Sequence, residues 1–201
     1  MNIAVFASGR GTNFSAIVKA VKKGRLKANL SLLVCDNPDA GVIKRAKAAG
    51  VKVALVKRED FSTLRDFENA IIQRLEEEGI GLIALAGFMR MLSGEFVSRY
   101  RNKIINIHPA LLPCFKGEEG IKDAFDYGVK VTGVTVHFVD EKMDHGPIIL
   151  QAAIKIEEDD TLETLEAKIH KFEHQLYPQA IQLFIEGKLK LADRKVKIST
   201  Q

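Results

Sequence analysis

The hydrophobic positions of this chain alternate between short continuous runs and helical spacings. The run NIAVFA, residues 2–7, is typical of a buried strand, and the stretch NFSAIVKAVKKG, residues 13–24, has the spacing of an amphipathic helix. Gly24 predicts the end of that helix. Its apolar face is formed by Phe14, Ile17, Val18 and Val21.

The same alternation repeats through the first half of the sequence. We expect strands at 30–35, 51–56, 82–87 and 104–108, and helices at 40–49, 61–78 and 93–100. Strands that alternate with helices predict an α/β fold whose parallel sheet is covered on both faces. We therefore expect an open, doubly wound, mostly parallel, Rossmann-like sheet, with a ligand crevice at the carboxyl ends of its strands.

The pattern changes after residue 130. VTGVTVHFVD, residues 131–140, and GPIILQAAIKI, residues 146–156, predict an antiparallel strand pair near the C-terminal part. A long helix is expected from about Thr161 to Ile185, with Pro178 kinking or splitting it. No repeat or flexible linker interrupts the pattern, so residues 1–201 are expected to form a single domain.

Composition narrows the class of protein. The chain has 201 residues, 46% hydrophobic and 28% charged, which is an ordinary globular balance. Its net charge is +4, yet basic and acidic residues are interspersed except in the tail KLKLADRKVK, residues 188–197. That tail lacks the aromatic side chains on which nucleic-acid bases stack, so we expect a solvated edge and no nucleic-acid partner.

Other features indicate the cellular setting. No apolar tract is long enough to cross a membrane, and the N-terminal strand is not preceded by a basic leader, so neither a membrane partner nor secretion is expected. The two cysteines, Cys35 and Cys114, form no disulfide framework, which favours the reducing cytoplasm.

The loop SGRGTN, residues 8–13, joins the first strand to the first helix. Its glycines let backbone N–H groups converge at the positive end of a helix, which favours a phosphate. A dinucleotide fingerprint would need a third glycine at Phe14, and no P-loop lysine is present. We expect one phosphate at Gly11, Thr12 and Asn13; the alternative is a plain turn with Thr12 or Asn13 capping the helix.

The strand IINIH ends with two polar side chains. Residues two apart in a strand share a face, so Asn106 and His108 project together while Ile105 and Ile107 pack on the other side. An amide can donate to a developing oxyanion, and an imidazole can donate or carry a proton near neutral pH. A buried structural histidine beside a turn asparagine is the alternative, but the pair at a strand end favours function.

Two carboxylates are further candidates. Asp144, in the loop DEKMDHGP, would favour the charged form of His108 if the two lie close together, although the loop alone is more typical of a plain turn. Glu173 could bind a ligand hydroxyl or amine, or could be an exposed helix acid.

His170 and His174 have helical ligand spacing without the HExxH pattern, so no metal is expected. Cys114 has no evident base beside it, so we do not expect a nucleophile.

Five motifs together resemble the family of folate-dependent glycinamide ribonucleotide formyltransferases: SGRGTN, LAGFMRML, NIHPALLP, DHGPIILQ and FEHQLYP. The resemblance extends from the first strand to Tyr177 and Pro178. The asparagine, histidine and aspartate are shared with all formyltetrahydrofolate-using relatives, whereas the phosphate loop, the FMR stretch and Glu173 are more specific.

The resemblance implies formyl transfer from the cosubstrate 10-formyltetrahydrofolate to the amine of glycinamide ribonucleotide, a step of de novo purine synthesis. The phosphate of the acceptor would lie at Gly11, Thr12 and Asn13, and Glu173 would hold its ribose or glycinamide end. Arg65 would meet the folate glutamate tail. The folate would contact Phe88, Met89, Arg90, Met91, Leu92 and Asn106.

The resemblance also implies roles for the two parts of the chain and for the catalytic groups. Residues of about 1–100 would bind phosphate, and about 101–185 would bind folate and catalyse the reaction. Asn106 and His108 would stabilise the oxyanion, and Asp144 would raise the pKa of His108, without a metal.

The sequence departs from the family at two places, and rival functions stay open. Ala110 replaces a common serine, and the acidic stretch KGEEGIKD, residues 116–123, is expected to be a loop over the substrates. The rivals are a hydrolase that releases formate, a transfer-RNA formyltransferase and a non-catalytic phosphometabolite-binding module. The first two usually carry an extra domain, for which we expect no room here. The protein could be a monomer or a homodimer.

Overall fold

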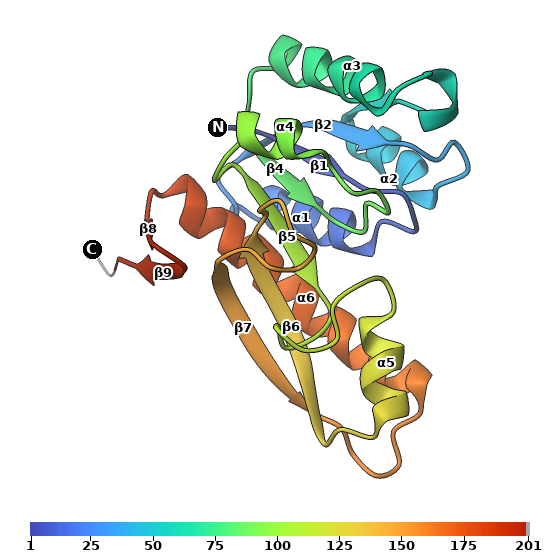
Figure 1. Cartoon of the computed structure of the whole chain (residues 1–201), viewed down its shortest axis with the longest axis vertical. Helices are drawn as coiled ribbons and strands as arrows, with labels where there is room; N and C mark the ends of the chain where they lie inside the picture. The colour runs from blue at the N-terminus through green and yellow to red at the C-terminus, as the bar shows by residue number, and fades with distance from the viewer. Residues whose placement is uncertain (200–201) are drawn as a thin grey trace.

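Nine strands form one sheet in the computed structural model, which describes residues 1–199 (Figure 1). Their order is β3-β2-β1-β4-β5-β6-β7-β9-β8. The first five pair in parallel, and β6 and β7 pair antiparallel, as predicted. β5 also pairs antiparallel with β6, so this run of parallel strands ends at β5. The bounds are β1 Asn2–Phe6, β2 Asn29–Cys35, β3 Lys52–Leu55, β4 Ile80–Leu85, β5 Ile104–His108, β6 Val131–Phe138, β7 Ile148–Lys155, β8 Leu189–Ala192 and β9 Lys195–Ile198.

Helices cover both faces of the sheet because its central parallel strands, such as β1, β2 and β4, are buried on both sides. One hydrophobic cluster joins the sheet to α1, α2 and α6, and the other joins it to α3 and α4. Figure 1 shows α3 and α4 together beside the N-terminal strands, and α6 running behind β5 and β6. The bounds are α1 Thr12–Lys22, α2 Gly41–Ala49, α3 Leu64–Glu77, α4 Gly94–Arg99, α5 Gly120–Tyr127 and α6 Leu162–Ile185.

The strand order reverses between β1 and β4. The chain first runs outward from β1 through β2 to β3, and then returns to place β4 on the other side of β1. The loops that leave the carboxyl ends of β1 and β4 therefore diverge to opposite faces and leave a crevice between them. The predicted ligand position lies at this crevice.

Several elements differ from the prediction. Residues 120–127 form α5, which begins inside the stretch 116–123 that was expected to be a loop. Ile121, Ala124 and Phe125 have the i, i+3, i+4 spacing of a short helix. α3 begins at Leu64, after a short 3-10 helix at Arg58–Asp60, rather than at residue 61. Pro178 does not split α6, which continues through it to Ile185.

The basic tail was expected only as a solvated edge, but its residues form the β8–β9 hairpin. Most side chains of both strands are exposed, while Leu189 and Val196 pack against the core. No helix within residues 1–199 has the length and apolar composition needed to cross a membrane.

Tyr177 connects α6 to the centre of the sheet. Its side chain is fully buried, and its hydroxyl lies 2.6 Å from the carbonyl oxygen of Leu85 at the end of β4 and 2.9 Å from that of Ile105 in β5. Burial raises the pKa of Tyr177 well above its ordinary value, so the hydroxyl keeps its hydrogen and donates it to these carbonyls. The side chain therefore satisfies two strand carbonyls next to the crevice.

We expect the substitution Tyr177→Phe to lower the free energy of unfolding by about 1 to 3 kcal/mol, because it leaves buried carbonyls without a donor. Tyr127→Phe is the matched control, since Tyr127 is 80% exposed and loses no buried partner. Urea denaturation of both variants measures the difference. Equal stabilities for the two variants would contradict the assigned role of the Tyr177 hydroxyl.

Candidate active site

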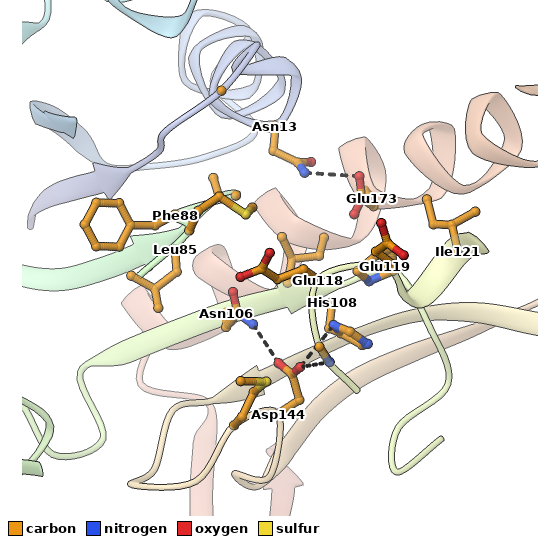
Figure 2. Close-up of a pocket in the computed structure, with 18 of the residues that line it drawn as sticks. Asn13, Leu85, Phe88, Asn106, His108, Glu118, Glu119, Ile121, Asp144 and Glu173 are labelled. Atoms are coloured by element: carbon orange, nitrogen blue, oxygen red, sulfur yellow. Dashed lines mark hydrogen bonds and ion pairs between the residues drawn. The ribbon is translucent and has the colours of Figure 1, made fainter. Parts of the chain in front are cut away.

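A single cavity of about 600 Å³ lies at the crevice. It is lined by the loops after β1 and β4, the end of β5, the loop between β6 and β7, and one side of α6. Figure 2 shows Asn106 and His108 between Asp144 on one side and Asn13 and Glu173 on the other. The predicted residues that line it are Gly11, Thr12, Asn13, Phe88, Met89, Arg90, Met91, Leu92, Asn106, His108, Asp144 and Glu173.

His108 is held by the segment that follows β5. Its Nε2 atom lies 2.7 Å from the carbonyl oxygen of Phe115, and because a carbonyl only accepts, Nε2 carries the hydrogen. Its Nδ1 atom lies 3.4 Å from Asp144 Oδ2. When His108 becomes charged, the added proton is on Nδ1 and faces this carboxylate.

The pKa of His108 differs from the expectation. Asp144 does raise it, and so does the Phe115 carbonyl, but burial of the imidazole lowers it by more, so the net pKa is below 6.5. Only 3% of His108 is exposed. His108 is therefore predominantly neutral at neutral pH, and Asp144 limits rather than reverses the effect of burial.

Asn106 and His137 form a cross-strand pair, opposite each other in the β5–β6 ladder. His137 Nδ1 donates to the Phe138 carbonyl at 2.8 Å, which leaves Nε2 of the neutral ring as an acceptor. Asn106 Nδ2 lies 3.2 Å from that Nε2 and 3.4 Å from Asp144 Oδ1. This orients the amide so that its nitrogen faces the histidine and the aspartate.

Asp144 is the point at which these groups meet. Oδ2 accepts a hydrogen bond from the Gly117 backbone N–H at 2.9 Å, and Oδ1 lies 3.6 Å from His137 Nε2. Burial raises the pKa of Asp144, but the hydrogen bond from the Gly117 N–H and the positive charge that His108 or His137 carries when protonated lower it by more, so the net pKa is below its ordinary value. The carboxylate is therefore negatively charged beside His108.

The segment after His108 is itself anchored to β6. The Thr135 hydroxyl donates to the Ala110 carbonyl at 2.7 Å and accepts from the Leu112 N–H at 3.1 Å. Thr135 pairs directly with His108 across the strands. The position of the chain leading to Phe115, and hence the tautomer of His108, depends on this buried threonine.

The phosphate candidate sits at the beginning of α1. Gly11 precedes the helix with φ 76°, and no side chain caps the first-turn N–H groups. Thr12 and Asn13 are therefore not capping residues, and these N–H groups remain available to an anion. A Cβ on Gly11 would lie 2.6 Å from Val42 Cβ, so only glycine fits this loop against α2.

Glu173 is buried on α6, not exposed as in the alternative interpretation. It is 4% exposed, and its Oε2 accepts from Asn13 Nδ2 at 3.1 Å and from His170 Nδ1 at 2.8 Å. Its Oε1 takes no hydrogen bond from any side chain within residues 1–199. The hydrogen bond from His170 raises the pKa of that histidine. Glu173 thus presents a free carboxylate oxygen next to the loop at Gly11.

The segment of residues 88–92 is tied to the phosphate loop. The Met89 N–H donates to Ser8 Oγ at 3.1 Å, and both Ser8 and the Arg90 guanidinium hydrogen-bond to Asp36. Met89 and Met91 are more than half exposed. Arg65, by contrast, does not line the cavity, so its contact with a glutamate tail stays a prediction.

The alternative of a metal site finds no structural support. No cluster of three or more histidine, cysteine or acidic side chains within the described part of the chain is arranged to hold a metal ion. The His170 and His174 rings are stacked, with centroids 6.3 Å apart, and His170 is paired with Glu173. Cys114 is exposed and does not line the cavity.

Sequence reasoning missed His137 and Gly117 as parts of the site. His137 lies in an alternating strand, where its partner became apparent only once β6 was paired with β5 in register. Gly117 contributes a backbone N–H, which carries no side-chain signal. The single ionisable residue in the strand VTGVTVHF was the one available indication.

Comparisons with known proteins indicate one family for this chain. The family model described as formyl transferase matches residues 1–181. The phosphoribosylglycinamide formyltransferase of Bacillus subtilis (strain 168) is 51% identical over 179 residues, 89% of this chain and 92% of the relative. The glycinamide ribonucleotide transformylase 1 structure from Symbiobacterium toebii has TM-score 0.96 and 42% identity, and covers 98% of this chain and 93% of that one.

A longer relative contains a similar region. The trifunctional purine biosynthetic protein adenosine-3 of Gallus gallus is 39% identical over 193 residues, 96% of this chain. This chain spans only 19% of that relative's length.

We expect Asp144→Asn to lower the pKa of His108 further, because it removes the charge that opposes the effect of burial. NMR titration of the His108 imidazole measures the shift directly. The same substitution should lower turnover by about 10² to 10⁴ if His108 shuttles protons in the reaction. A His108 pKa that is unchanged or raised in this variant would contradict the coupling of the two residues.

Proposed function

The chain belongs to the formyl transferase family, and we propose that it is a phosphoribosylglycinamide formyltransferase. It transfers the formyl group of 10-formyltetrahydrofolate to the amine of glycinamide ribonucleotide, giving the N-formyl product and tetrahydrofolate in purine biosynthesis. The donor is consumed as a second substrate, and the residues described above require no metal. The observation that carries the proposal is the convergence of Asn106, His108 and Asp144 in the cavity that also contains the loop at Gly11.

The acceptor would bind at the α1 end of the cavity. Its phosphate would accept hydrogen bonds from the uncapped N–H groups at Thr12 and Asn13, with the helix dipole favouring the negative charge. The free Oε1 of Glu173 would accept from a ribose hydroxyl or from the glycinamide end. Both contacts leave the amine directed toward Asn106 and His108.

The donor would bind along residues 88–92. Ser8 and Asp36 hold this segment from the side of the phosphate loop, which keeps its backbone groups in place for a planar ring. Phe88 packs edge-on against Phe6 of β1, with ring centroids 5.3 Å apart. A pocket lined by apolar side chains and ordered backbone groups suits a pterin.

The reaction forms a bond from the acceptor nitrogen to the formyl carbon and breaks the bond from that carbon to N10 of the folate. Negative charge develops on the formyl oxygen, where the N–H groups of Asn106 and His108 would donate. The Nε2–H of His108 now donates to Phe115, and the two N–H groups of Asn106 face His137 and Asp144. The formyl oxygen would therefore have to replace one partner of each residue. One proton leaves the amine and one reaches N10, with His108 and Asp144 carrying the charge between them.

We extend the proposal to the organisation of the chain. Residues 1–201 would act as a single domain, with phosphate bound by about residues 1–100 and folate binding and catalysis centred in about 101–185. The cavity walls come from both parts, which supports their acting together. The cytoplasmic location and the choice between monomer and homodimer stay predictions.

One assay separates this function from its rivals. Loss of the formyl group from 10-formyltetrahydrofolate is followed spectrophotometrically with and without glycinamide ribonucleotide. Loss that depends on the acceptor supports the transferase, and loss without it supports a hydrolase. No loss in either condition would favour a binding module or another acceptor and would contradict the proposal.

We expect His108→Ala to lower kcat by about 10² to 10⁴, while the dissociation constant for glycinamide ribonucleotide changes little. Calorimetric titration and the formyl-loss assay give the two quantities. Cys114→Ala is the control, because this exposed thiol lies outside the cavity and should not affect turnover. A variant at His108 that retains full activity would rule out its catalytic role.

Gly11→Ala should raise the KM for glycinamide ribonucleotide about tenfold or more, equivalent to losing about 1.4 kcal/mol of phosphate binding. The added Cβ would displace the loop from Val42, and φ 76° is strained for alanine. Gly41→Ala is the control, since its Cβ would meet the Arg10 backbone at an ordinary 3.6 Å. An unchanged KM with Gly11→Ala would place the phosphate elsewhere.

A further inference from the structure

The loop that carries Asp144 is contacted from outside by the C-terminal hairpin. Arg194, at the turn between β8 and β9, donates from Nη2 to the carbonyl oxygen of His145 at 2.6 Å. Its Nη1 lies 3.2 Å from Nδ1 and 3.0 Å from Nε2 of the same histidine, so the guanidinium rests against the imidazole. Arg194 therefore contacts both the backbone and the side chain of the residue that follows Asp144.

His145 is in turn hydrogen-bonded to another residue of the same loop. Its Nδ1 donates to Asp140 Oδ2 at 2.7 Å, and Asp140 Oδ1 accepts from the Lys142 N–H at 3.0 Å. The loop is thus held at both of its ends by one chain of hydrogen bonds. Asp140 and Lys142 line the cavity together with Asp144, so the inner surface of this loop forms part of the site.

The conformation of the loop requires such support. Asp144 has φ 46°, in the left-handed region that non-glycine residues adopt only when their surroundings hold them there. Gly146 lies so close to β6 that an added Cβ would be 1.8 Å from the Phe138 carbonyl oxygen. A constrained backbone of this kind places the Asp144 carboxylate within 3.4 Å of both Asn106 Nδ2 and His108 Nδ1.

The hairpin contributes little to the core, against which only Leu189 and Val196 of its strands pack within the described residues. Figure 1 shows the β8–β9 hairpin at the end of the chain, beyond α6. Both strands are largely exposed, and β9 pairs with β7 at Ile148 and Lys195. The match to the family model ends at residue 181, so Arg194 lies beyond the region that the family model covers. Within residues 1–199, side-chain hydrogen bonds between the hairpin and the loop that carries Asp144 are formed only by Arg194 with His145.

We propose that Arg194 is a positioning residue, which holds the loop of residues 140–146 so that Asp144 stays beside Asn106 and His108. The expected effect of Arg194 on turnover rests on the proposed formyl transfer. Its expected effect on the conformation of the loop does not. Arg194 is exposed, so its bonds add little to global stability and act mainly on the local conformation of the loop.

The kinetic test compares Arg194→Ala, Arg194→Lys and Lys197→Ala. Arg194→Ala should lower kcat about tenfold and leave the KM for glycinamide ribonucleotide unchanged, because small displacements of a catalytic group reduce turnover without touching the phosphate loop. Arg194→Lys should restore part of the loss, since lysine can still donate to the His145 carbonyl. Lys197→Ala removes the same charge from an exposed position of β9 and should behave as the wild type.

Hydrogen–deuterium exchange of the substrate-free protein tests the structural step independently. The amides of residues 141–146 should exchange faster in Arg194→Ala than in Lys197→Ala, with unfolding midpoints that agree. If the wild-type protein showed no acceptor-dependent loss of the formyl group, the proposed function would be overturned. Hydrogen exchange of the loop would still decide whether Arg194 holds it in place. Two results would overturn the inference. One is that Arg194→Ala and Lys197→Ala show the same loop exchange and the same kcat. The other is that Arg194→Ala lowers both kcat and thermal stability while exchange of the loop stays unchanged.

Discussion

A buried negative charge at Asp144 is the constraint on which the site depends. A carboxylate removed from water must be compensated by donors or positive charge, and here the compensating groups come from different parts of the chain. Gly117, before α5, and Asn106, at the end of β5, donate hydrogen bonds to it. His108 of β5 and His137 of β6 place ring nitrogens 3.4 and 3.6 Å from its oxygens, where a proton on either ring would be stabilised. Meeting that one requirement brings two loops and two strands together at the same point.

The same arrangement leaves the two catalytic candidates with different properties. Asn106 is a fixed donor, since His137 and Asp144 orient its amide. His108 is buried enough to favour its neutral form, yet it faces a carboxylate that stabilises the proton when one arrives. Burial and Asp144 therefore act as opposing influences on the protonation of one residue.

The position of this site follows from the sheet. Since β4 lies on the opposite side of β1 from β2, the loops after β1 and β4 separate, and the end of β5 enters the space beside them. α6 crosses behind and supplies both Tyr177, which satisfies strand carbonyls, and Glu173, which reaches Asn13. Binding groups for a phosphate and groups for acyl transfer thereby line one cavity, in agreement with the similarity to glycinamide ribonucleotide transformylases.

The sequence by itself determined the strands and helices of the doubly wound sheet, the common face of Asn106 and His108, and the glycine at the phosphate loop, because these depend on local periodicity and backbone freedom. It also contained the spacing of α5, which was overlooked. Only the tertiary structure decided that His137 lies opposite Asn106, that Arg194 reaches His145, and that burial outweighs Asp144 in the pKa of His108. Strand register, long-range contacts and solvent exclusion depend on residues far apart in the chain, and no local pattern specifies them.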